Sequence, residues 1–210
     1  MKKILSMMFA VTLAVLLCAG CSKEQFAART FEGEAQTVVL DLENTAVEVV
    51  PSEDGQVRVA YYESEKRGLS IVLDGGTLTV TSDGAGASLG VLPEVSYRTV
   101  KVYLPAGLAS ISLTTTGESV ALSDISAGEV ALDVNGGDVS FERLAVGVSL
   151  GVTVKNGNIA GSLLGGWDDF AVSCTVKKGE SNLPERKEGG EKSLSVDCNN
   201  GDVDIELLPQ

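Results

Sequence analysis

Short runs of alternating apolar and polar residues fill the chain from Thr37 onward, and each run ends at a turn. Such alternation is typical of β-strands that bury one face, and no segment of useful length in this region shows a helical period of 3.6 residues. The turns recur at a spacing of about 20 residues, which predicts an internal repeat. The turn positions are Gly55, Gly76, Arg98, Glu118, Gly137, Gly157, Gly179 and Gly201.

Apolar residues keep fixed distances from these turns, which confirms the register of the repeat. The column five residues before the turn holds Ile71, Leu113, Leu132, Val152, Cys174 and Val196. The column two residues after it holds Val57, Leu78, Val100, Val120, Val139, Ile159 and Val203. Val47 and Val49 stand outside these columns, so the first repeat is looser than the others.

Each repeat therefore consists of a strand, a turn and a second strand, and it is too small to bury its own apolar face. Stacked repeats bury that face when every strand pairs with its equivalent in the next repeat. The shared register predicts parallel strands in an all-β solenoid of about eight rungs. An antiparallel sandwich also has many short alternating strands, but it does not require the same columns every 20 residues or so.

The N-terminus has the pattern of a secretory signal for a lipoprotein. Lys2 and Lys3 precede an apolar stretch over 4–18, which is too short for a typical membrane span. Ala19-Gly20-Cys21 then resembles a bacterial lipobox, although its usual leucine lies one place early, at Leu17. The resemblance implies cleavage before Cys21 and a lipid on that residue; the alternative is an ordinary signal peptide with a chance cysteine.

These observations divide the chain into three parts. We expect a lipoprotein signal peptide at 1–20, a lipidated N-terminus and tether at 21–36, and a β-solenoid domain at 37–210. The polar residues 22–30 are expected to hold the fold off the membrane. The predicted location is the bacterial cell envelope, outside the cytoplasm and anchored to the membrane.

The step Val102-Tyr103-Leu104-Pro105 before the regular rungs, together with the strand–Gly–Asp–strand repeats, resembles a known family. From Val38 to Leu207 the chain is similar to the putative-adhesin family catalogued as domain of unknown function 4097. The resemblance implies a right-handed parallel β-helix. It brings no catalytic residues with it.

Composition excludes several classes of function. The net charge of −13 makes a nucleic-acid partner unexpected, because phosphate binding needs clustered lysine and arginine. The chain has no histidine, which excludes Ser-His-Asp and Cys-His catalysis and histidine-ligated zinc. No cofactor is expected.

The lengthened turn before one regular rung carries the only tryptophan, in Gly165-Gly166-Trp167-Asp168-Asp169-Phe170. Trp167 either folds over the edge of the solenoid and covers the core, or it is an exposed binding tip for a sugar ring or a partner protein, with Asp168 and Asp169 beside it. The sequence leaves both interpretations open.

A polar column directly follows the turns and consists of Gln56, Thr77, Ser119, Asp138, Asn158, Glu180 and Asp202. Stacked oxygens of this kind either hold calcium or bond nearby backbone within the turns. The repeats lack the dense Gly-Asp nonapeptide pattern of calcium-binding β-rolls, so no metal site is expected.

The last rung gathers the acids Asp197, Asp202, Asp204 and Glu206, which are expected at the open end of the solenoid. Paired carboxylates cleave glycosides, so the alternative hypothesis is a carbohydrate-active β-helix enzyme. Acidic residues at an open end also discourage edge-to-edge aggregation. The leading hypothesis is a non-catalytic, adhesin-like envelope lipoprotein that binds a protein or a glycan. The sequence specifies neither the ligand nor the oligomeric state.

Two cysteines, Cys174 and Cys198, lie in inward columns of adjacent rungs but two residues out of step. One rung and two residues separate them, which predicts about 8 Å between their Cα atoms. Disulfides rarely span more than about 7 Å, so both are expected to be buried, reduced thiols.

Overall fold

The computed structural model describes residues 24–83 and 92–209, and it is all-β as predicted. The signal peptide and Cys21 lie outside the described residues. The strands are β1 (Ala27–Gly33), β2 (Thr37–Glu43), β3 (Ala46–Pro51), β4 (Val57–Glu63), β5 (Gly68–Asp74), β6 (Thr77–Asp83), β7 (Thr99–Leu104), β8 (Leu108–Thr116), β9 (Val120–Ser123), β10 (Ser126–Val134), β11 (Val139–Asn156), β12 (Ile159–Leu164), β13 (Phe170–Lys178), β14 (Arg186–Lys187), β15 (Lys192–Asn200) and β16 (Val203–Leu208). Two single 3-10 turns, η1 (Val95–Arg98) and η2 (Trp167–Asp169), precede β7 and β13.

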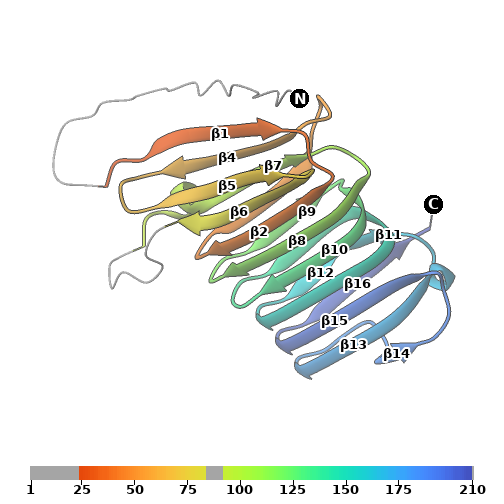
Figure 1. Cartoon of the computed structure of the whole chain (residues 1–210). Coiled ribbons are helices and arrows are strands. Elements are labelled where there is room, and N and C mark those ends of the chain that lie inside the picture. Colours follow the sequence, from red (N-terminus) through yellow and green to blue (C-terminus); the bar gives the residue numbers. More distant parts are fainter. Residues whose placement is uncertain (1–23, 84–91, 210) are drawn as a thin grey trace, which may run out of the picture.

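Most strands form two stacks of parallel pairs, which Figure 1 shows as a long twisted array. The first stack runs β6–β2–β8–β10–β11–β15–β13. The second runs β7–β3–β9–β11–β12–β16. The long strand β11 takes part in both, because its first residues pair with β9 and β12 and its last with β10 and β15.

The predicted columns form the core between the two stacks. Leu132 pairs with Leu113 on one side and with Val152 on the other, and all three side chains are buried. The intervening residues, such as Thr153, are exposed. The alternation predicted from the sequence is therefore confirmed for the central rungs.

The fold is not parallel throughout, and the predicted turn at Gly76 has a different role. β5 and β6 form an antiparallel hairpin around Gly75 and Gly76, whose φ angles are +56° and +80°. Positive φ at both central residues is the requirement of a tight hairpin turn, and two glycines meet it. β6 then joins the first stack, with Leu78 beside Val38, instead of starting the second strand of a rung.

The first rung also differs from the prediction, which centred it on Gly55. Its strands are β2 and β3, and Val47 pairs with Val120 while Val49 pairs with Leu122, so both valines are in register. The corner has no glycine, since Asn44 adopts the positive φ of +49° there. β4, which follows Gly55, is instead antiparallel to β1 and β7.

The rungs do not stack in chain order at either end. β15 lies between β11 and β13, and β2 lies between β6 and β8. The expectation that the last rung is the open end was therefore wrong for Asp197, which has Thr153 on one side and Thr175 on the other. β16, which carries Asp204 and Glu206, forms a ladder only with β12 and ends the second stack. Because the apolar columns are the same in every rung, the sequence pattern does not determine which rungs are neighbours.

The predicted tether is shorter than expected, because Ala27–Gly33 forms strand β1 along β4. Its polar composition hid it, since only Phe31 packs against the core. Hydrogen bonds to β4 and the ion pair of Arg29 with Glu63, at 2.7 Å, hold the strand in place.

The register around the two cysteines is confirmed. Cys174 pairs with Val196 and Cys198 with Val176, so the two thiols are diagonal neighbours, and both are buried and free. Burial raises the pKa of the Cys198 thiol, which keeps it protonated and poorly nucleophilic.

Denatured but unreduced mature protein carrying Cys21→Ala should therefore take up two alkyl groups, as measured by intact mass. The folded protein should take up none at neutral pH on the same timescale, because both thiols are shielded. If the mass of the denatured protein shows no added alkyl groups, the two cysteines form a disulfide and the last rung is shifted by two residues against its neighbour.

Candidate functional site

The turn that carries Trp167 is shaped by Gly165 and Phe170. Phe170 is fully buried and fills the core where β13 begins. A Cβ on Gly165 would lie 2.7 Å from the Phe170 ring, so only glycine leaves room for it. Asp169 closes the turn by accepting a hydrogen bond from the Gly166 N–H at 2.7 Å.

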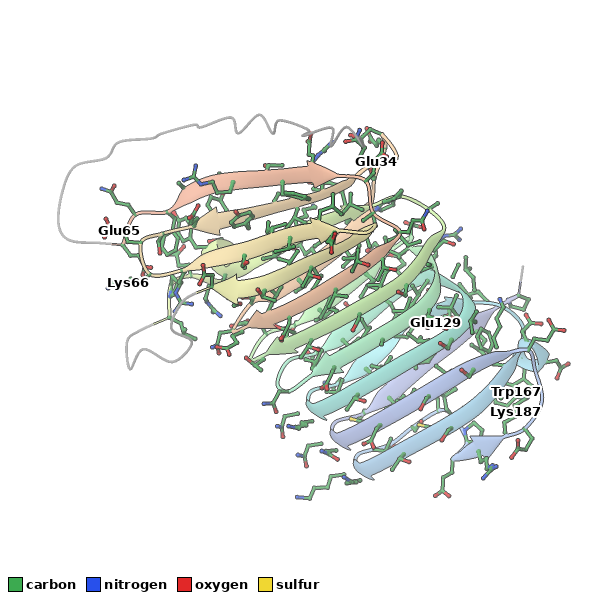
Figure 2. The ribbon with its side chains drawn as sticks, viewed as in Figure 1. Glu34, Glu65, Lys66, Glu129, Trp167 and Lys187 are labelled. Carbon is green, nitrogen blue, oxygen red and sulfur yellow. The ribbon has the colours of Figure 1, made fainter. Side chains whose placement is uncertain are left out.

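Trp167 is 47% exposed, because Phe170 already closes the core at this point. The Lys187 ammonium lies 5.3 Å from the centroid of the indole ring, a cation–π distance. The same ammonium donates to the Phe170 carbonyl oxygen at 2.7 Å, which fixes it beside the ring. Figure 2 shows Trp167 and Lys187 together near one end of the array.

Lys187 belongs to β14, which lies in the charged loop after β13 and pairs antiparallel with it. The support that this loop gives to Trp167 was missed from the sequence. The site thus offers a half-exposed aromatic ring, a fixed cation and the exposed carboxylate of Asp168. Such a set can stack on a flat apolar surface and bond polar groups at its edge.

The polar column after the turns is engaged in hydrogen bonds between rungs. Ser119 accepts from the Asp138 N–H, and Asp138 accepts from the Asn158 N–H at 2.8 Å. Asn158 accepts from the Asp202 N–H, and Asp202 from the Glu180 N–H, both at 2.9 Å. This is the turn chemistry that the sequence left open beside calcium. Among the described residues, no group of three or more His, Cys, Asp or Glu is placed to hold a metal ion.

The acids of the last rung have similar structural roles. Asp204 and Glu206 share the outer face, as the alternation predicts. Asp204 accepts a hydrogen bond from the Asn182 amide at 2.8 Å, and the Asn182 oxygen accepts from the Ile205 N–H. These contacts bind the last two rungs of the stack to each other.

A shallow cleft, open to solvent, lies at the opposite end of the array and was missed from the sequence. Its aromatic lining is Tyr61, Tyr62 and Tyr97, beside Lys66 and Arg67. The one available signal was that all four tyrosines of the chain fall between residues 61 and 103.

The buried side chain beneath this cleft is Arg98, one of the turn positions of the predicted repeat. Its guanidinium donates to the carbonyl oxygens of Pro93 and Asn44 and forms an ion pair with Glu118. Arg98 therefore ties η1 to the corners of two rungs and is not free to bind a ligand.

A family model, Toastrack DUF4097, matches residues 35–208. The chain belongs to the Toastrack DUF4097 family. Among curated proteins, none matches the chain significantly. In the part of this family member that the structure describes, no helix is long and apolar enough to cross a membrane.

Solved structures similar to this Toastrack chain share little sequence with it. A putative cell adhesion protein from Clostridium sporogenes has 12% identity and a TM-score of 0.59, with 88% of this chain and 100% of that chain covered. A putative adhesin from Bacteroides fragilis has 11% identity and a TM-score of 0.39, covering 87% of this chain and 98% of that one. The likeness to the Clostridium protein shows a shared fold.

Proposed function

We propose that this chain is a non-catalytic, adhesin-like binding module of the bacterial cell envelope. A lipid on Cys21 anchors it outside the cytoplasm, and Trp167 at the far end contacts a protein or a glycan. The N-terminal signal pattern supports the location, and the fold shared with the putative cell adhesion protein from Clostridium sporogenes supports the class of function.

The two stacks of parallel strands support a right-handed β-helix as the frame of this module. Parallel strands joined by crossovers are right-handed in about 98% of cases. The antiparallel strands β1, β4 and β5 then form a separate cap at the N-terminal end.

The half-exposed indole of Trp167 is the observation that carries the binding proposal. A large aromatic side chain that does not close the core, and is fixed by a lysine, is suited to contact another molecule. The carbohydrate-active alternative gains no comparable support, because Asp202 and Asp204 of its acidic cluster are occupied in bonds between rungs.

Replacing Cys21 by alanine should move the protein from the membrane fraction to the soluble fraction, because the lipid is lost. Fractionation after a carbonate wash measures the share of the protein in the membrane fraction, and the protein that keeps Cys21 is the control. A variant that still fractionates with membranes after the wash would contradict anchoring at Cys21.

Trp167, as the only tryptophan, can report its own contacts. We expect a ligand found in a protein and glycan screen to shift the emission of the mature protein, and Trp167→Ala to weaken binding at least about tenfold, as for an aromatic hot spot. Val148→Ala, at an exposed valine of β11, is the control and should bind normally. Equal affinity of Trp167→Ala and native protein for the ligand would refute the proposal that Trp167 contacts it.

A further inference from the structure

The folded part of the chain begins close to the predicted anchor. Cys21 lies three residues before Glu24, and the Glu24 carboxylate accepts a hydrogen bond from the Ser64 hydroxyl at 2.5 Å. Three residues of extended chain span at most about 11 Å. A lipid on Cys21 therefore holds the turn between β4 and β5 close to the bilayer, with no long spacer between them.

Aromatic rings gather at this place. Phe26 stacks on Tyr97 with ring centroids 4.5 Å apart, and Tyr62 meets Tyr97 edge-on at 5.3 Å. The rings still face solvent after packing on one another, since Tyr62 is 42% and Tyr97 39% exposed. Phe26 brings the N-terminal segment itself into the cluster, so the cluster sits where the chain leaves for the anchor.

Exposed apolar side chains are concentrated in the same region. Of the eight large apolar side chains exposed among the described residues, Tyr62, Leu92, Val95 and Tyr97 lie on β4 or on the segment that contains η1. Exposed apolar side chains gathered in one region mark a site of contact with another molecule or with a membrane.

Acidic side chains outnumber basic ones around the rings. Lys66 and Arg67 stand in the same turn as Glu65, while Glu24 bonds Ser64, Glu94 precedes η1, and Glu43 and Asp83 line the cleft. Attraction to anionic lipid therefore does not explain the surface. Tyrosine, with an apolar ring and a polar hydroxyl, is suited to the boundary between lipid and water, and Lys66 can extend its ammonium toward water.

We infer that the surface formed by Phe26, Tyr62, Leu92, Val95 and Tyr97, here called the aromatic end, lies in the headgroup layer of the anchoring membrane. This inference rests on the proposed lipid at Cys21. The module then stands directly on the bilayer and is not suspended above it. Figure 2 shows Glu65 and Lys66, next to the aromatic end, far from Trp167 and Lys187.

The same placement fixes the direction of the binding tip. Six strand-to-strand steps separate β6, beside the aromatic end, from β13, which follows Trp167. At about 4.8 Å per step, the two ends lie about 29 Å apart. The aromatic end faces lipid while Trp167 faces away from it.

Brominated phosphatidylcholine vesicles can test this with the lipidated, full mature protein. Trp167→Phe removes the native tryptophan, and Tyr97→Trp in that background places a reporter in the aromatic end. We expect brominated vesicles to lower its emission about twofold relative to unbrominated ones, because an interfacial ring lies near the bromine atoms. Tyr62→Trp is a second reporter, and native Trp167 is the control, whose emission should not change.

Flotation of each variant with the vesicles separates this inference from the anchor on which it rests. A protein that floats while Tyr97→Trp and Tyr62→Trp keep full emission overturns the membrane contact and leaves the anchor intact. Quenching of Trp167 as strong as that of Tyr97→Trp also overturns it, since the module would then lie flat. A native protein that does not float overturns both the anchor and the inference.

Discussion

Gly157→Ala should destabilise the protein by about 3 kcal/mol or more, among the largest effects of a single substitution. Gly157 has φ of +151°, and a Cβ there would lie 2.0 Å from the carbonyl oxygen of Gly137 in the neighbouring rung. That oxygen belongs to backbone and cannot turn aside. The same contact recurs when Gly201 meets Gly157 and Gly179 meets Gly201, so the corners form one continuous glycine ladder.

Gly151→Ala is the matched control, because Gly151 lies in β11, the strand that ends just before Gly157, has no positive φ, and has nothing within 4 Å of the point where a Cβ would stand. We expect a change within about 0.5 kcal/mol. Urea unfolding of mature protein carrying Cys21→Ala compares the two midpoints. Similar midpoints would show that the corner backbones are not in close contact.

Leu132→Asp should cost about 4 kcal/mol, because it buries a carboxylate without a partner between Leu113 and Val152. The melting temperature and the urea midpoint of the same mature protein measure the loss. A mild effect would mean that the inward column has been misassigned.

The control for Leu132→Asp lies one column outward, at exposed Thr153. Its neighbours in the stack are Asp133 and Asp197, so Thr153→Asp would place three carboxylates in a row and cost about 1 kcal/mol by repulsion. Added salt should relieve that part of the loss. Thr153→Asn avoids the repulsion and should be nearly neutral, which makes it the better control.

The central rungs were predictable because their apolar columns and their turns agree. The cap at the N-terminal end was not, because alternation is the same in parallel and antiparallel strands. Asp74-Gly75-Gly76-Thr77 resembles Asn135-Gly136-Gly137-Asp138 in sequence, but the first is a hairpin turn and the second a corner between stacked rungs. Their φ angles separate them, because Gly75 and Gly76 both have a positive φ, at +56° and +80°, whereas in the second pair only Gly137 has one, at +127°.

The two ends of the molecule differ in how far the sequence revealed them. Trp167 stood out as the only tryptophan, in a lengthened turn, although its exposure and its contact with Lys187 needed the structure. The aromatic end could not be predicted, because Phe26, Tyr62 and Tyr97 come from three separate segments. Their meeting depends on the pairing of β4 with β7, which no column indicates.

The insertion of β15 between β11 and β13 determines when the molecule can be completed. A chain made from its N-terminus presents β13 before the strand that must lie beside it exists. The C-terminal segment therefore completes the assembly: a product cut short before residue 192 lacks β15 and β16 and leaves bare edges on β11, β12 and β13, which are open to proteolysis and aggregation. For the same reason, the array cannot be lengthened by adding a repeat after the C-terminus. New rungs fit only in its middle, where neighbours in sequence are also neighbours in space.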